Sequence, residues 1–481
     1  YTARLYNREN YKALVAMSEK HPDYLGIIEE IRADILGCIG AVPSLPSVYG
    51  NAKHGPGTAV GLNGAGGEVT TYFSWLPPYT VSPKCMPYAK QAIMSHPQWV
   101  GALMDNYREK SGIPQYAPIN LEKFWESVLE VIDYCKYASV PKTAETDRSI
   151  AIEPALNVFL QLGCDRIIRS RLKKRWHVDL STQDKNQKLA LKGSLDNDSV
   201  TIDLKGASET VTLMLCLILL PEGWYDLLTD LRSEKILIEG EYSPLAKMSA
   251  MGNGFTFALE SLIFAALVRC AMRRTRSIGE TAVYGDDIVV PKTAAKYLIQ
   301  LLSLAGFSIN EDKSFIDGPF RESCGKDYYR GQLVRPFFLK KKVSTVIDLF
   351  YIHNSLCVLE ENLPWAWDVS FKQTKRWLRS FIPPKFRDVY GPYTECLDSH
   401  LFSKRRLFRV NPYCLAYLTI IVNAKVYNKG TSFFFRRLMK TYQQTPTDKW
   451  DEARKMTTGS AFDVTKRGRI AYRQSVQLAW G

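Results

Sequence analysis

The chain has 481 residues, of which 46% are hydrophobic and 23% are charged. This balance excludes an intrinsically disordered chain, and the length exceeds what one hydrophobic core supports, so two to four domains are expected. Lys and Arg outnumber Asp and Glu by 63 to 49, a formal net charge of +14, and 12% of the residues are aromatic. Together these features favour a polyanionic partner such as a nucleic acid over a generally basic protein without one.

The ten cysteines are scattered without a CxxC pair, and the six histidines are equally dispersed. This pattern argues against a zinc site and for reduced thiols in a cytosolic setting. The longest apolar runs, 211–220 and 413–422, are too short to cross a bilayer, and no secretory signal is visible. A membrane is therefore not expected as a partner.

Hydrophobic periodicity in the first third predicts helices over 9–18, 24–36 and 121–134. The intervening stretch 42–79 is rich in Pro and Gly but lacks the Gly-Lys-Ser/Thr ending of a phosphate-binding loop, which indicates ordinary turns. Residues 140–150 and 166–175 are basic. Such runs are either solvated faces or contacts to a nucleic-acid backbone.

The middle of the chain alternates strand and helix patterns. Residues 199–204 predict a strand that carries Asp203 on the face opposite to its apolar side chains. Helices are predicted over 208–220, 255–272 and 294–305; Gly306 ends the last of them, and residues 307–310 then look extended.

The tetrapeptide Tyr284-Gly285-Asp286-Asp287 lies between two short β-type runs, 281–284 and 288–290. This arrangement predicts a tight hairpin that carries two adjacent carboxylates. Because adjacent carboxylates repel each other, their pairing points to a bound cation. The alternative is a surface hairpin whose acids only interact with water.

Asp203 would join this pair if its strand and the hairpin were neighbours in one antiparallel sheet, since the three carboxylates would then converge. Two Mg²⁺ ions about 3.5–4 Å apart use such a set for in-line nucleotidyl transfer. Oxygen ligands suit Mg²⁺ or Mn²⁺. One ion would activate an attacking 3′-hydroxyl, and the other would neutralise charge on the leaving pyrophosphate.

The order of these segments resembles palm motifs A to D of viral RNA-dependent RNA polymerases. The matching segments are Asp203, 249–254, 284–287 and Lys313. Within residues 136–342, four stretches are similar to the replicase catalytic (beta) subunit of RNA bacteriophages, the Qβ-like leviviruses: 141–150, 201–208, 251–260 and 320–331. Outside that region the resemblance is weak.

The resemblance implies an α+β right-hand polymerase whose palm is an antiparallel sheet with helices. The fingers would comprise residues 1–198 and 213–242, the palm 199–212 and 243–335, and the thumb 336–481. Basic and aromatic clusters at 340–342, 372–379, 404–409 and 433–437 would guide RNA through charge and base stacking.

The resemblance also assigns roles to single residues. It implies that Asp203 and Asp286 are the principal metal ligands and Asp287 a weaker one. Ser249, Gly252 and Asn253 match the motif B loop, which positions the template and senses the ribose 2′-hydroxyl; the alternative for the last two is a plain turn at a helix start.

Further roles follow from the same resemblance. Lys142 and Arg148 would clamp the incoming triphosphate, unless they are solvated surface charges. Lys313 would protonate the departing pyrophosphate. Arg321, Ser323 and Cys324 belong to a stretch that would contact the end of the nascent strand; a purely structural hairpin is the alternative.

The chain departs from the family pattern after Asp203. The family usually has Ser-Ser after Asp-Leu and a second Asp at the end of this motif, whereas this chain has Lys205 and Glu209. The recognition of the ribose and the metal preference therefore stay open.

The implied function is RNA-directed RNA polymerase activity that replicates a phage single-stranded RNA genome from nucleoside triphosphates in the cytoplasm of an infected bacterium. Implied partners are template and product RNA, host elongation factors Tu and Ts, and a ribosomal small-subunit protein. Two alternatives stay open: a reverse transcriptase, and a non-enzymatic RNA-binding protein on the same fold. Tyr284-Gly285 and Asn253 favour the RNA polymerase.

Overall fold

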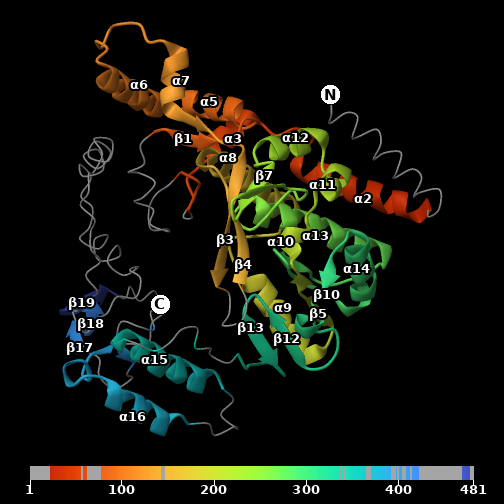
Figure 1. The fold of residues 1–481 in the computed structure, drawn as a ribbon. Helices are drawn as coiled ribbons and strands as arrows, with labels where there is room; N and C mark the ends of the chain where they lie inside the picture. Colours follow the sequence, from red (N-terminus) through yellow and green to blue (C-terminus); the bar gives the residue numbers. More distant parts are fainter. Residues whose placement is uncertain are drawn as a thin grey trace. The chain divides into compact units, whose positions relative to one another are not determined.

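The computed structural model describes residues 22–55, 58–61, 77–141, 147–335, 339, 343, 345–363, 370–391, 397, 400–402, 408–411, 414–421 and 469–476 (Figure 1). The predicted helix over 9–18 and the basic clusters at 340–342 and 433–437 lie outside these residues. The chain divides into two compact units between Gly331 and Gln332.

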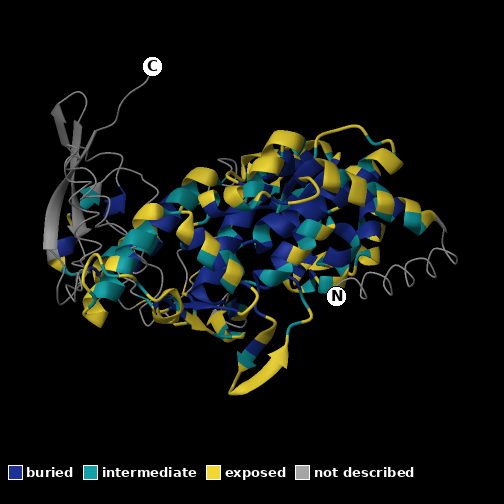
Figure 2. Ribbon diagram, turned by 90° about the horizontal axis from the view of Figure 1, so that it is seen from above, coloured by how far each residue is buried: buried dark blue, intermediate teal, exposed yellow. Residues whose placement is uncertain are grey.

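Three helices form the centre of the first unit: α2 (Pro22–Ile39), α8 (Ala155–Trp176) and α13 (Thr256–Arg274). Most residues of α13 are buried, as expected for a helix that is apolar on all sides. Helix α14 (Lys292–Leu304) packs beside it and ends at Ala305, followed by Gly306 with a positive φ. The helices predicted over 24–36, 255–272 and 294–305 are confirmed. In Figure 2 the buried residues fill the interior of this unit and the exposed residues cover its outside.

The helix predicted over 121–134 is wrong in its second half. Helix α7 (Leu121–Val128) stops at Val128, and the chain continues as β2 (Leu129–Val131), which pairs in parallel with β1 (Tyr79–Val81). The alternating, partly β-branched run after Val128 fits a strand, and its partner lies far away in the sequence. Three helices complete this region: α3 (Leu45–Asn51), α5 (Met86–Met94) and α6 (Pro97–Ser111).

A three-stranded antiparallel sheet of order β5-β10-β9 lies beside these helices. Its strands are β5 (Ser199–Ile202), β9 (Ala282–Tyr284) and β10 (Asp287–Pro291). Ile288 is opposite Ile202 and Val283. The predicted hairpin is confirmed. The strand predicted over 199–204 is confirmed for 199–202 only, and all four residues of β5 are buried, so both faces of that strand are covered. A two-stranded sheet of β6 (Leu204–Lys205) and β11 (Ser308–Ile309) continues from the end of β5.

The single helix predicted over 208–220 is interrupted. Helix α10 (Ala207–Thr210) and helix α11 (Leu213–Leu219) are separated by Val211 and Thr212. Val211 accepts a backbone hydrogen bond from Met248, and Thr212 forms a bridge with Lys247. Pairing with a distant segment therefore replaces helical bonds at this β-branched pair. Helix α12 (Glu222–Asp230) follows.

A four-stranded sheet of order β4-β3-β7-β8 forms a separate layer. Its strands are β3 (Tyr134–Pro141), β4 (Asp147–Ile152), β7 (Lys235–Ile238) and β8 (Glu241–Pro244). Cys135, Ala151 and Ile236 form a small buried cluster with Ala250 on one face. The other face of the sheet does not take part in this cluster.

The hairpin of β12 (Phe320–Ser323) and β13 (Lys326–Tyr329) packs against helix α9 (Asp184–Asp196) and strand β5. It follows the 3₁₀ helix η1 (Glu311–Lys313). The hairpin therefore lies next to the strand that leads to Asp203.

The second unit contains the helices α15 (Val346–Asn362) and α16 (Lys372–Phe381), and a 3₁₀ helix, η3 (Pro384–Phe386). Its strands are β14 (Gln332–Leu333), β15 (Tyr390–Gly391), β16 (Leu401–Phe402), β17 (Phe408–Asn411), β18 (Cys414–Ile421) and β19 (Arg469–Val476). Thr345 and Asp348 form a capping box at the start of α15. Among the described residues, no helix of either unit is long and apolar enough to cross a membrane.

Candidate active site

The central sheet brings the predicted acids to one edge. Ile202 of β5 is opposite Ile288 of the antiparallel strand β10. Asp203 follows Ile202 and Asp287 precedes Ile288, so both acids adjoin the last residue pair at one end of these two strands. Asp286 lies in the adjacent turn between β9 and β10. Strand pairing thus gathers residues that are far apart in the sequence.

Close packing fixes the turn that carries Asp286. Gly285 has a φ of +60°, and a Cβ atom there would be 2.6 Å from Cε2 of Phe257. Its backbone N–H donates to Oγ of Ser261 at 3.0 Å. The ring of Phe257 also contacts Tyr284, with the ring centroids 4.8 Å apart. Residues in the first turns of α13 therefore pack against this turn and hydrogen-bond to it.

Asp203 is held by the segment after α14. Nδ2 of Asn310 donates to Oδ2 of Asp203 at 2.7 Å. The backbone N–H of Asp203 donates to Oγ of Ser314 at 3.1 Å. Sequence reasoning did not identify Asn310 or Ser314, because nothing in their local sequence shows that they lie beside β5.

Asp287 is held by the β12–β13 hairpin. Its Oδ1 accepts hydrogen bonds from Oγ of Ser323 at 3.1 Å and from the backbone N–H of Cys324 at 2.8 Å. Both residues are buried. The two residues expected to contact the nascent strand instead orient a predicted metal ligand in this structure.

Arg321 also departs from its expected role in RNA contact. The side chain is fully buried, and its guanidinium donates to Oδ1 of Asn197 and to backbone carbonyls that include that of Ser199. A buried guanidinium needs such partners, because leaving its donors unpaired is costly. Arg321 therefore fits the alternative interpretation, in which this hairpin has a purely structural role.

Two further charged groups lie near these acids. Burial, and then the charges of Asp287 and Asp327, raise the pKa of Glu322 to about 7. Asp203 also raises this pKa and Lys313 lowers it, so both residues lie near Glu322. Lys313 is exposed at the end of η1. The role of Lys313 in protonating pyrophosphate stays a prediction.

Glu260 of α13 is a buried acid beneath the same turn. Its Oε2 accepts a hydrogen bond from Oγ of Ser208 at 2.7 Å, and a Cβ atom on Gly285 would be 3.0 Å from its Oε1. Burial raises the pKa of Glu260 to about 8; the Ser208 hydrogen bond lowers it, and the charge of Asp286 raises it. Sequence reasoning missed Glu260. The signal that could have identified it is an acid within the mostly apolar helix segment 258–263.

The loop before α13 packs on strand β4. Ser249 is buried, and its Oγ donates to the carbonyl of Ser208 at 3.1 Å. Gly252 has a φ of +114°, and a Cβ atom there would lie 2.1 Å from the carbonyl oxygen of Ala151. Gly252 is therefore required by a close approach between two backbone segments.

The amide of Asn253 is used within the protein. Its Oδ1 accepts a bond from the backbone N–H of Ala250 at 2.9 Å, and its Nδ2 donates to Oε1 of Glu153 at 2.7 Å. Glu153 is buried and also accepts hydrogen bonds from Ser233. One amide proton of Asn253 is left outside these two bonds, so a contact to a ribose hydroxyl would use that proton.

One of the two residues predicted to bind the triphosphate, Arg148, lies on strand β4. Arg148 is exposed on β4 and is opposite Val140 of β3. Lys142 lies outside the described residues. The alternative of a solvated surface charge stays open for Arg148.

The two unusual residues of motif A lie at the edge of the site. Lys205 is exposed on β6 and is opposite Ser308. The carboxylate of Glu209 lies 3.9 Å from Nζ of Lys247. Glu209 therefore lies near Lys247, which belongs to the segment just before the motif B loop.

The three aspartates share one sheet edge, but they do not form a closed metal cage. In the part of the chain that the structure describes, no three His, Cys, Asp or Glu side chains are grouped as metal ligands would be. The convergence of the three carboxylates on a metal ion therefore stays a prediction. The donor chemistry still fits a divalent cation, because Asp203 and Asp287 offer carboxylate oxygens next to the last paired residues of β5 and β10. Mg²⁺ commonly takes one or two carboxylates and completes its shell with water and substrate phosphates.

A comparison with protein families matches residues 105–479 to the family described as "RNA replicase, beta-chain". The RNA-directed RNA polymerase subunit beta of Qbeta virus (strain MX1) is 46% identical over 232 residues, which is 48% of this chain and 39% of that protein. The corresponding subunit of Escherichia virus Qbeta is 38% identical over 332 residues, which is 68% of this chain and 51% of that protein.

The chain spans about half or less of the length of these curated relatives. Among solved structures, the RNA-dependent RNA polymerase of a human picorbirnavirus is 15% identical with a TM-score of 0.35, and the match covers 52% of this chain and 55% of that one. The family match covers most of the present chain and includes every acid described above. The chain therefore belongs to the RNA replicase beta-chain family.

Proposed function

We propose that this chain is the catalytic subunit of an RNA-directed RNA polymerase that copies the single-stranded RNA genome of an RNA bacteriophage. The supporting observation is the antiparallel pairing of β5 with β10, in which Ile202 is opposite Ile288; Asp203 and Asp287 adjoin this pair, and Asp286 precedes Asp287 in the turn. Membership of the replicase family and the relatives' names agree with this activity.

In this proposal Asp203 and Asp286 hold two divalent cations, Mg²⁺ or Mn²⁺, and Asp287 is the weaker ligand. The bound cations would supply activation of the 3′-hydroxyl and neutralisation of the triphosphate charge. Asn310 orients the carboxylate of Asp203, and the β12–β13 hairpin orients that of Asp287. These fixed orientations reduce the rearrangement that substrate binding requires.

Cationic side chains complete the proposed chemistry. Lys142 and Arg148 bind the triphosphate of the incoming nucleotide, and Arg148 contributes a planar fork that matches phosphate oxygens. Lys313 donates a proton to the departing pyrophosphate; its nearness to Glu322 and the acids supports this role. Ser249, Gly252 and Asn253 form the loop next to the template and ribose.

The proposed domain assignment is fingers for 1–198 and 213–242, palm for 199–212 and 243–335, and thumb for 336–481. The division of the chain after Gly331 lies close to the proposed palm–thumb boundary and supports it. The name "subunit beta" of the relatives supports a replicase of several subunits. Host elongation factors Tu and Ts and a ribosomal small-subunit protein are the proposed partners, in the cytoplasm of the infected bacterium.

The test of this function is Asp286→Asn in the purified full chain, assayed with labelled GTP on a short RNA ending in CCC, with and without bacterial lysate. The substitution removes a metal-binding charge, so Mg²⁺-dependent synthesis should fall by at least about a hundredfold, as when other electrostatic groups of active sites are removed. RNA affinity should change little. Asp105→Asn on the exposed surface of α6 is the matched control. Undiminished synthesis by Asp286→Asn would exclude this mechanism.

The same assay separates the alternatives. Incorporation of deoxyribonucleotides in preference to ribonucleotides would identify a reverse transcriptase. RNA binding without synthesis under any of these conditions, for the unaltered chain, would identify a non-enzymatic binding protein.

A further inference from the structure

The β4-β3-β7-β8 sheet has one face that carries aromatic and cationic side chains. Cys135 and Ile236 belong to the buried face. Side chains alternate along a strand, and the register sets Tyr134 opposite Lys235 and Leu237 opposite Tyr242. These residues therefore lie on the opposite face, which we call the outer sheet face. It includes Tyr134, Lys136, Val140, Arg148, Lys235, Leu237 and Tyr242.

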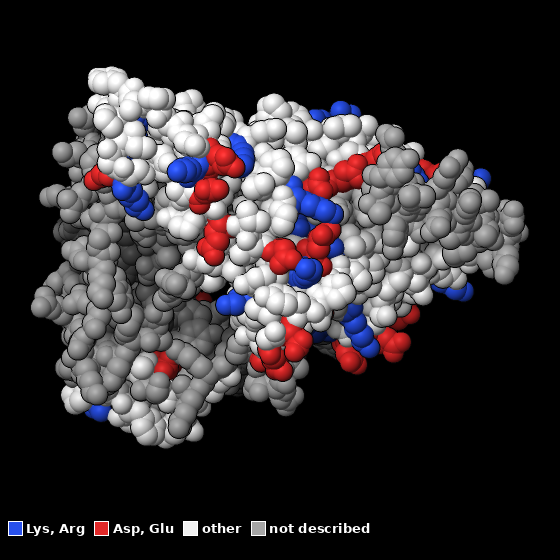
Figure 3. Space-filling view, turned by 45° about the horizontal axis from the view of Figure 1, so that its top comes forward, with Lys and Arg blue, Asp and Glu red and all other residues white. Residues whose placement is uncertain are grey.

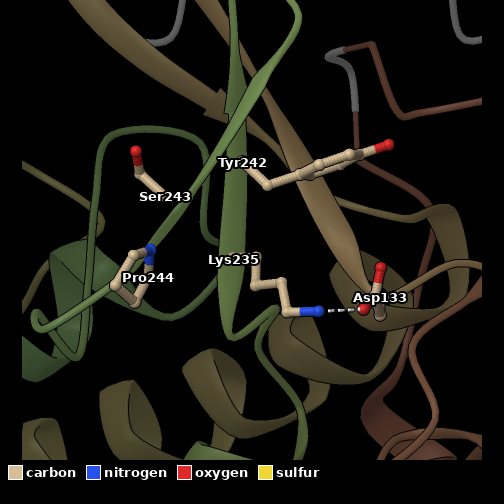
Figure 4. Close-up of a pocket in the computed structure, with 5 residues that line it drawn as sticks. All are labelled: Asp133, Lys235, Tyr242, Ser243 and Pro244. Carbon is tan, nitrogen blue, oxygen red and sulfur yellow. Dashed lines mark hydrogen bonds and ion pairs between the residues drawn. The ribbon is translucent and has the colours of Figure 1, made fainter.

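A cavity lies at one end of the outer sheet face. It has a volume of about 370 Å³ and is lined by Asp133, Lys235, Tyr242, Ser243 and Pro244. Figure 4 shows Tyr242 and Lys235 extending to the side of β7 where Asp133 lies. The volume is within the range of about 300–1,000 Å³ typical of small-molecule sites. A single nucleotide is a ligand of this class.

Tyr242, which lines the cavity, contacts the ring of Tyr134 edge to face. Their ring centroids are 5.2 Å apart and the rings are inclined at 64°. Tyr242 is 57% exposed, so part of this residue is open to a ligand. Unpaired bases stack on such rings regardless of sequence, because every base has a π-face.

The cations of this face are available to phosphate. Lys136 and Arg148 are exposed. Lys235 forms an ion pair with Asp133 at 2.5 Å, and both side chains are about half exposed, at 50% and 52%. An exposed ion pair contributes little to stability, so exchange of Asp133 for a phosphate has a small cost. From Tyr134 to Val140 the face extends roughly 20 Å, at about 3.3 Å per residue.

We infer that the outer sheet face binds single-stranded RNA, with a base stacked on Tyr242 beside Tyr134 and the backbone phosphates near Lys136 and Lys235. The inference rests on the proposed function for the identity of the polyanion. A duplex fits less well, because its bases are not accessible to these rings. A docked protein fits less well too, since the cores of protein interfaces are depleted of the charge found here.

The experiment measures binding of a fluorescein-labelled 12-residue oligouridine to the full chain, without Mg²⁺ and without nucleotides. Tyr242→Ala should weaken binding at least about fivefold, because base stacking contributes about 1–3 kcal/mol. Tyr116→Ala, at a tyrosine that is 95% exposed, is the matched control and should bind normally. Lys136→Ala should reduce the slope of log K against log salt by about 0.7.

Binding by Tyr242→Ala within twofold of the unaltered chain would overturn the inference. Unchanged RNA affinity combined with loss of a co-purifying protein would overturn it as well and identify a protein-docking face. Because the assay measures binding and needs no RNA synthesis, the RNA-binding inference can be rejected without rejecting the proposed polymerase function, and the reverse. RNA binding that depends on Tyr242, in a chain without polymerase activity, would support the RNA-binding inference and exclude the proposed polymerase function.

Discussion

Gly285 shows how one residue type determines the position of the proposed catalytic turn. The two-residue connection between β9 and β10 needs a positive φ, which glycine adopts without strain. The same residue lets Phe257 and Glu260 approach the turn closely. The turn is thus fixed from one side by the helix and from the other by the sheet.

We predict that Gly285→Ala destabilises the protein by about 2–5 kcal/mol, through positive-φ strain and overpacking together. Gly206→Ala is the matched control, because Gly206 has a φ of +57° but nothing within 4 Å of a Cβ atom. It should show only the strain, about 1–2 kcal/mol. Urea unfolding of both variants measures the difference, and equal stabilities would contradict the packing argument.

Arg321 shows where residue-level prediction from sequence ends. Its motif pointed to RNA contact, yet its side chain is fully buried, whereas the adjacent Glu322 lies near the acids. Neighbouring residues of a strand face opposite sides, so the outcome depended on which face of β12 meets α9 and β5. That choice is made by contacts between distant segments, and the local sequence does not contain it.

At the scale of elements, local signals predicted α13, α14 and the β9–β10 hairpin correctly. Helical periodicity, a glycine after the last turn and the Gly-Asp turn are all encoded locally. The predictions over 121–134 and 208–220 failed where a strand or bridge forms with a distant segment, as at Leu129 and Thr212. The antiparallel pairing of the Asp203 strand with the hairpin was a condition of the proposed site and is observed, whereas the hydrogen bonds around Asp203 were not predicted.

Helices α2 and α13 are joined by an ion-pair network in which Arg273 contacts Glu30 at 2.5 Å and Asp34 at 2.5 Å. Its side chain is 41% exposed, so solvent screens these pairs. Arg273→Ala should lower the free energy of unfolding by about 1 kcal/mol in low salt and by less in 1 M NaCl. The measurement is urea unfolding at both salt concentrations.

Arg32→Ala, at an exposed position of α2, is the control for this prediction. A stability loss at Arg273 that is the same in low and high salt would show that packing of the arginine stem, rather than charge, joins the helices.

At the scale of the whole molecule, net charge and local charge have opposite signs at the proposed site. The chain carries +14 overall, but the sheet edge collects Asp203, Asp286 and Asp287. On the face shown in Figure 3, Lys and Arg are interspersed with Asp and Glu among the described residues. Composition therefore pointed to a polyanionic partner without indicating where it binds.

The local excess of negative charge predicts that divalent cations stabilise the fold independently of catalysis. A ligand that binds only the folded chain adds about 1.4 kcal/mol when its concentration is ten times its Kd. Mg²⁺ should therefore raise the midpoint of thermal unfolding of the unaltered chain. Asp203→Asn removes one carboxylate from the edge, so its midpoint should respond less.

The control for this last prediction is NaCl at matched ionic strength, which reports screening of surface charge without specific binding. Asp105→Asn should respond to Mg²⁺ as the unaltered chain does, because that residue lies on the surface of α6. If Asp203→Asn and the unaltered chain gained equally from Mg²⁺, the cation would bind elsewhere, and the sheet edge would lose its proposed role as the metal centre. A smaller gain in Asp203→Asn would tie the cation to the end of the β5–β10 pair, next to Ile202 and Ile288.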